Sequence, residues 1–141
     1  MELDLALKSN LSCMNKLNEI DTFTFQKLAE LLFETVPEFH EYCLKSKIFD
    51  DFEVGGYSFM NEFSIRLANE INTYTSSDFI SHSFTYINLI GTSKNLEVLN
   101  ILKVGILEIL FTSGQVCRDY TSTMLNSNVQ ILFNDYSRFY S

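Results

Sequence analysis

With 141 residues, the chain fits a single domain, 1–141, that is large enough to bury a core without a metal ion or a disulfide. Its composition of 46% hydrophobic and 20% charged residues excludes an intrinsically disordered segment. Its net charge of −8 offers no basic surface for phosphate groups, so we predict no direct binding of nucleic acid.

Redox and targeting features predict a cytoplasmic protein. The cysteines Cys13, Cys43 and Cys117 are odd in number and too widely spaced for a CxxC motif, which fits a reducing compartment. The first residues, MELDLALK, hold two carboxylates where a signal peptide needs positive charge. The most apolar stretch, 101–111, is too short to span a bilayer, so we predict no membrane association.

Helical periodicity dominates the chain. One proline and five glycines interrupt it, and apolar residues recur at a spacing of three and four. Residues 1–20 stay weakly assigned, because 3–5 alternate like a strand whereas 7–17 could lie on a helix. We predict an all-α fold, a single-domain bundle of about six or seven helices that could stack as helical hairpins.

Two helices should meet at a proline near the N-terminal end. Thr22 or Thr24 can cap a first helix with its apolar residues on one face. Pro37 should end that helix, since proline pushes the preceding residue out of the helical conformation, and open a second helix through about Lys47. We expect a sharp corner there.

Serine caps predict the next two helices. Ser58 can be the N-cap of a helix through about Ile71. After a polar connection, Ser76 or Ser77 can cap a helix through about Ile90.

The fifth predicted helix, 94–111, is apolar almost all round, and such a helix belongs in the centre of a bundle. The turn Gly91-Thr92-Ser93 should stop the fourth helix and cap the fifth, so these two should form a hairpin. Two more helices are predicted near 115–125 and 128–140.

Negative charge is concentrated in one third of the chain. Residues 19–62 contain ten acidic and three basic side chains, a net charge of −7, while the rest contains eight acidic and seven basic side chains, a net charge of −1. Carboxylates at Glu38 and Glu41 would stabilise the first turn of a helix by about 0.3–1 kcal/mol each. That explanation does not extend to Asp50, Asp51 and Glu53, which lie in a connection.

The stretch 49–63, FDDFEVGGYSFMNEF, fails as a calcium loop. Counting from Asp51 places Glu53 and Glu62 at the third and twelfth positions of an EF-hand, but glycine and tyrosine occupy the fifth and seventh. A solvated acidic loop is favoured, and no metal site is predicted.

No other motif predicts a reaction. The segment 56–60 lacks the second glycine and the preceding strand of a nucleophile elbow, and Gly55-Gly56 lacks the Lys-Ser/Thr of a phosphate loop. His40 and His82 have no partner fixed by the sequence and are interpreted as surface or capping histidines. We predict no catalytic residue, no cofactor and no enzymatic activity.

The acidic stretch suits an interaction surface. Aromatic residues beside carboxylates, such as Phe49, Phe52 and Tyr57, fit an interface with apolar anchors and steering charge, although the phenylalanines can instead turn inward as core. The predicted partner-binding residues are Asp50, Asp51, Glu53, Tyr57, Glu62, Glu34, Glu38 and Glu41.

A family resemblance favours the same class of function. The order of 25–33 (FQKLAELLF), 36–39 (VPEF), 59–63 (FMNEF) and 95–110 (NLEVLNILKVGILEIL) resembles an uncharacterised family of small bacterial all-helical proteins. Some of its members look like immunity proteins of contact-dependent growth inhibition and related polymorphic toxin systems. The resemblance covers about 24–112. It implies a cytoplasmic protein that binds and neutralises a cognate toxin domain, and it carries over no catalytic residue.

The preferred hypothesis is stoichiometric occlusion of a basic toxin domain, such as a nuclease, by the acidic surface. An alternative is a small helical enzyme that uses a carboxylate pair, with Asp51 and Glu62 as the first candidates, and a divalent metal ion. A further alternative is a non-catalytic scaffold subunit of an acidic oligomer.

Overall fold

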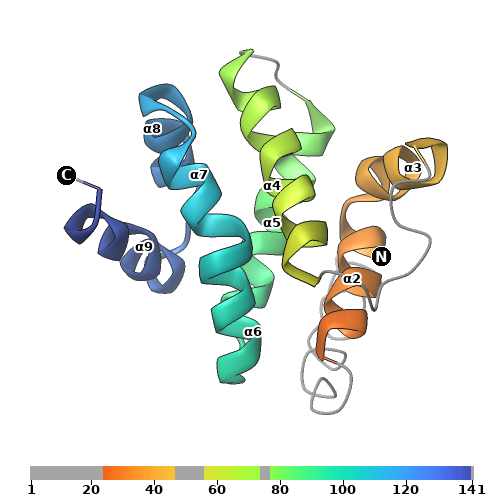
Figure 1. Cartoon of the computed structure of the whole chain (residues 1–141), viewed down its shortest axis with the longest axis horizontal. Helices are drawn as coiled ribbons and strands as arrows, with labels where there is room; N and C mark the ends of the chain where they lie inside the picture. Colours follow the sequence, from red (N-terminus) through yellow and green to blue (C-terminus); the bar gives the residue numbers. More distant parts are fainter. Residues whose placement is uncertain (1–23, 47–55, 74–76, 141) are drawn as a thin grey trace, which may run out of the picture.

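The computed structural model describes residues 24–46, 56–73 and 77–140, and every element in these ranges is helical (Figure 1). The predicted all-α class is confirmed. The elements are α2 (Thr24–Thr35), α3 (Pro37–Ser46), α4 (Gly56–Asn72), α5 (Asp78–Ile90), α6 (Leu96–Ile101), the π-helical segment η1 (Leu102–Leu107), α7 (Glu108–Thr112), α8 (Gln115–Met124), α9 (Ser127–Asn134) and the 3₁₀ segment η2 (Asp135–Arg138).

The helices are arranged around α4, α5 and the continuous helix α6–η1–α7. Figure 1 shows α2 and α3 on one side of these central helices, and α8 and α9 on the other. α5 and α6–η1–α7 run in opposite directions, as the predicted hairpin requires (Figure 1). α4 packs along η1 and α7, so the apolar segment predicted to be central does lie in the middle.

An aromatic cluster joins α2, α3 and α4. Phe39 and Phe63 are buried with their ring centroids 5.3 Å apart, and Phe59 lies 5.6 Å from Phe39. Both contacts are edge-to-face, the arrangement that aromatic rings favour. Phe59, the first phenylalanine of α4, therefore turns inward, whereas Phe49 and Phe52 lie outside the described residues.

The π-helical segment was not predicted. In η1 the Glu108 N–H bonds to the Lys103 carbonyl five residues earlier, and the Tyr136 hydroxyl donates to the same carbonyl at 2.5 Å. The Ser64 hydroxyl lies 3.0 Å from the Gly105 carbonyl, where α4 approaches η1 closely. Side-chain hydroxyls from two other helices thus bond to carbonyls of this segment.

Helix beginnings confirm some predicted caps and correct others. Ser77 caps α5, accepting a bond from the Ile80 N–H at 3.3 Å. The prediction for Ser58 was wrong: α4 begins at Gly56, which puts Ser58 in the first turn. The cap of α6 is Asn95, because its short side chain reaches the Glu97 N–H at 2.9 Å.

One further boundary and the burial of the central helix differ from the sequence prediction. The helix near 128–140 ends as α9 at Asn134 and continues as the tighter η2. The central helix is not buried on all sides, since Leu96 is 80% exposed. A pattern of residue types identifies an apolar helix, but it does not show where the neighbouring helices stop covering it.

Candidate functional site

α3 has a buried edge and a polar edge. Phe39 and Cys43, four residues apart, are buried against the core. Glu38 and Tyr42, also four apart, are half-buried, and Glu41 between them is exposed. Since α3 begins at Pro37, the carboxylate of Glu38 lies in its first turn, where it interacts favourably with the helix dipole.

A side-chain pair links α3 to α5. The Nδ1 atom of His82 lies 2.7 Å from Oε1 of Glu38, and the two side chains are 44% and 33% exposed. The second oxygen of Glu38, Oε2, is buried and has no hydrogen-bond partner among the described residues. His82 is therefore a partly exposed histidine, as interpreted, but it pairs with a carboxylate that the sequence did not connect to it.

Tyr42 lies between a carboxylate and a guanidinium of α4. Its hydroxyl donates to Oε1 of Glu62 at 3.2 Å, and the guanidinium carbon of Arg66 lies 3.8 Å from the centre of its ring. Glu62 and Arg66 are four residues apart, so one side of α4 presents both charges. Burial, and to a smaller extent the negative charge of Glu62, raises the pKa of the neighbouring Cys43 thiol to about 11, and Arg66 opposes this shift.

These side chains form one polar surface on three helices. α3 supplies two glutamates and Tyr42, α4 supplies the charged side chains beside Tyr42, and α5 supplies the histidine beside Glu38. We call this surface the α3 face, and it consists of Glu38, Glu41, Tyr42, Glu62, Arg66 and His82.

The α3 face contains three of the predicted partner-binding residues. Glu38, Glu41 and Glu62 belong to it, and Glu41 also forms an ion pair with Lys45 at 3.2 Å. Exposed pairs of this kind contribute little free energy, so Glu41 can exchange Lys45 for another cation. Glu34 is exposed near the end of α2.

Tyr57 is directed elsewhere. Its hydroxyl accepts a hydrogen bond from Nδ2 of Asn100 at 3.0 Å, so it faces α6 and not α3. Tyr57 and Glu62 are five residues apart on one helix, which separates their directions by about 140°. The remaining predicted residues lie outside the described part of the chain: Asp50, Asp51 and Glu53.

Sequence reasoning missed two members of the α3 face. Arg66 and His82 are far from α3 in the sequence, and no local pattern connects them to it. A usable signal existed for Tyr42, since its spacing of four from Glu38 puts both on one side of a helix. The position of α5 against α3 is a tertiary feature that a single sequence does not contain.

The described residues contain no cluster of three metal-ligating side chains. Between 24 and 140, outside the two undescribed connections, no three His, Cys, Asp or Glu side chains are close enough to hold a metal ion. His40 stacks on Phe33 with ring centroids 4.3 Å apart and planes inclined by 17°. Its ring thus packs against an aromatic side chain on the surface of α2 and α3.

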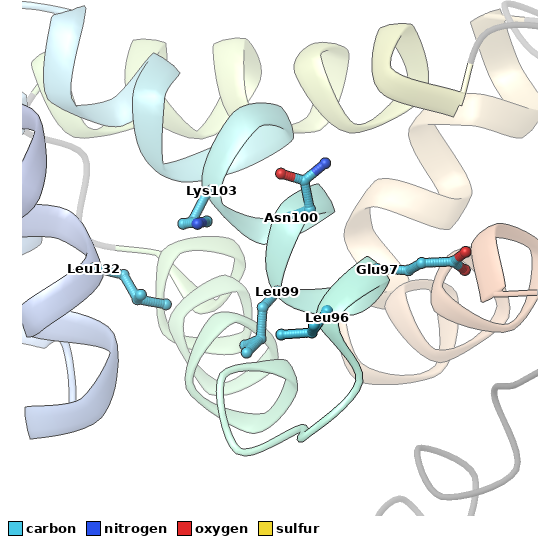
Figure 2. Close-up of a pocket in the computed structure, with 6 residues that line it drawn as sticks. All are labelled: Leu96, Glu97, Leu99, Asn100, Lys103 and Leu132. Atoms are coloured by element: carbon cyan, nitrogen blue, oxygen red, sulfur yellow. The ribbon is translucent and has the colours of Figure 1, made fainter.

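A second surface feature is a groove between α6 and α9 with a volume of about 420 Å³ (Figure 2). Apolar and polar side chains both line it, and Figure 2 shows Leu132 on the α9 side and the others on α6 and the start of η1. We call it the α6 groove, and its lining residues are Leu96, Glu97, Leu99, Asn100, Lys103 and Leu132.

Comparison with known proteins gives no match: no family model, no curated protein and no solved structure matches the chain. Among the helices of the described ranges, none is long and apolar enough to cross a membrane. The interpretation of the α3 face therefore depends on its own chemistry.

Proposed function

We propose that the protein is an immunity protein that binds a basic toxin domain, such as a nuclease, and neutralises it by stoichiometric occlusion. The observation that carries the proposal is the net charge of −7 in residues 19–62, against −1 in the rest of the chain. A charge concentrated in this way accelerates encounter with a basic partner and disfavours acidic ones.

The composition of the α3 face supports binding over catalysis. Tyrosine and arginine, here Tyr42 and Arg66, are enriched at protein interfaces and carry much of their binding energy. The carboxylates Glu38 and Glu62 already have partners on neighbouring helices, which restricts their conformations before a ligand arrives. Restricting side chains in advance lowers the entropy that binding costs.

The connection between α3 and α4 extends the proposal beyond the described residues. It carries Asp50, Asp51 and Glu53, and it joins the two helices that supply most of the α3 face. In the proposal these three carboxylates supply the long-range attraction, and the α3 face supplies the contacts that determine the dissociation rate.

The enzymatic alternative has less support. Of its candidate pair, Glu62 is hydrogen-bonded to Tyr42, and Asp51 lies outside the described residues. Calorimetric titration with calcium, magnesium, manganese and zinc separates the two functions. We expect no saturable heat from any of the four ions, and a saturable heat would favour the metal-dependent enzyme.

The direct test looks for a toxin domain encoded next to the gene of this chain, as the proposal requires, and mixes the two proteins. Increasing amounts of this protein should abolish the toxin's activity at a molar ratio of one to one, and the two should co-purify. Full toxin activity in the presence of excess protein would contradict the proposal, as would a neighbourhood of metabolic genes without any toxin.

A further inference from the structure

We propose that the α6 groove is the contact between two copies of this chain, which form a two-fold symmetric dimer. Leu96 is 80% exposed, the most exposed large apolar side chain among the described residues, and it lines the groove. A protruding leucine beside an apolar depression is self-complementary, since each copy offers both the side chain and the space that it fills.

The charges of the groove are arranged for such pairing. Figure 2 shows Glu97 extending towards α2 at one end and Lys103 lying near α9 at the other, with Leu96 and Leu99 between them. The Thr24 hydroxyl donates to Oε2 of Glu97 at 2.9 Å, which fixes the position of that carboxylate.

Two-fold symmetry pairs both charged ends of the groove in the same contact. A rotation of 180° about an axis through the middle of the groove places each apolar centre on the other and exchanges the two ends. Glu97 of one copy then faces Lys103 of the second copy, and the reciprocal pair forms as well. A partner with a different surface would have to reproduce this order of charges, whereas a second copy already has it.

The groove also lies where copies repel each other least. Residues 96–134 contain three acidic and two basic side chains, whereas 19–62 carry a net charge of −7. Approach through α6 and α9 therefore avoids most of the repulsion expected between two chains of charge −8. This inference does not depend on the partner proposed for the α3 face.

Sedimentation equilibrium of the full chain measures the association. We expect a reversible monomer–dimer equilibrium between about 1 μM and about 1 mM protein. Leu96→Asp should raise the dimer dissociation constant at least tenfold, because both copies lose a buried leucine and gain a charge. Leu44→Asp is the matched control, since Leu44 is 67% exposed on α3 and should leave the constant unchanged.

A charge exchange tests the pairing itself. Lys103→Glu should weaken the dimer by placing two carboxylates against each other at both ends of the contact. Combining it with Glu97→Lys should restore the dissociation constant to within about threefold of the original, because the charges again alternate between the copies. The circular dichroism of each variant shows whether its helices are intact.

The possible outcomes distinguish this dimer from a monomer and from a dimer through another surface. A concentration-dependent dimer that Leu96→Asp abolishes and the double exchange restores supports the proposal. A chain that stays monomeric up to the highest concentration overturns it. A dimer that Leu44→Asp weakens and Leu96→Asp does not would also overturn it, since the contact would then involve α3.

Discussion

The two sides of the central helices are held in different ways. α2 and α3 attach through completely buried apolar side chains: Leu28, Leu31, Leu32, Val36 and Phe39. α8 and α9 also bury apolar side chains, Cys117, Val129 and Phe133, but bonds from side chains to the backbone join them to α5 as well. Asn88 of α5 bonds both to the Met124 carbonyl at 3.0 Å and to the Asn126 N–H at 2.9 Å, and Asn128 donates to the Gly91 carbonyl at 2.8 Å.

This difference indicates which polar residues are available for binding. On the side of α8 and α9, amides such as Asn88 satisfy backbone groups, so their loss would weaken the fold. On the side of α2 and α3, the aromatic core provides the stability, and the carboxylates at the surface of α3 contribute little to it. We therefore expect substitutions in the two regions to separate stability from binding.

The largest expected effect is on the aromatic core. Phe39→Ala removes a completely buried ring and should lower the free energy of unfolding by about 3–5 kcal/mol. Phe139→Ala, on the other side, removes a ring that is 73% exposed and should change it by less than about 0.5 kcal/mol. Urea denaturation followed by circular dichroism measures both free energies of unfolding. Equal losses in the two variants would contradict the difference between the two sides.

A smaller effect is expected where α5 meets α9. An added Cβ at Gly91 would lie 2.2 Å from Cγ2 of the buried Val129, so Gly91→Ala should cost about 1–3 kcal/mol of stability. In a double-mutant cycle, Val129→Ala should remove most of that cost by making room for the methyl group. Additive losses would show that the steric contact is not the cause.

The Cys43 thiol predicts a pH dependence for the α3 side. Its pKa is raised from 9.0 to about 11 in the folded protein, so below pH 9 both states are protonated and its contribution to stability is fully present. Between pH 9 and about 11 the unfolded thiol ionises first, and stability should fall by roughly 1–2 kcal/mol from this group. The urea midpoint of Cys43→Ala should fall less steeply with pH over this range than that of the original chain. Parallel curves would show that the Cys43 thiol is not the source of the pH dependence.

The smallest effect is expected at the exposed surface of α3. Glu41→Gln removes an ion pair in which both side chains are mostly exposed, so stability should change by less than about 0.5 kcal/mol. A thermal melt compares this variant with the original chain. A loss above about 1 kcal/mol would mean that this carboxylate serves the fold and not a partner.

Local chemistry made much of the fold predictable. Pro37 begins α3 and Ser77 caps α5, because each acts on the backbone within one turn of itself. The π-helical segment was not predictable in the same way. The hydroxyls that bond to its carbonyls belong to Ser64 and Tyr136, which come from distant parts of the chain.

The acidic members of the α3 face could be predicted from the sequence, but its basic members could not. Glu38, Glu41 and Glu62 followed from counting carboxylates, and the structure brings them to one surface. Arg66 and His82 join them only because α4 and α5 pack beside α3, which no spacing in the sequence specifies.

The central claim is that the acidic segment attracts a basic partner. Stopped-flow kinetics with the cognate toxin domain that the proposal requires should give an association rate constant that falls steeply with added salt. The variant with Asp50→Asn, Asp51→Asn and Glu53→Gln should associate more slowly and show a weaker salt dependence. The variant with Glu70→Gln, Asp119→Asn and Asp135→Asn makes the same change of charge elsewhere and should behave like the original chain. Identical rate constants for the original chain and both variants would contradict the claim.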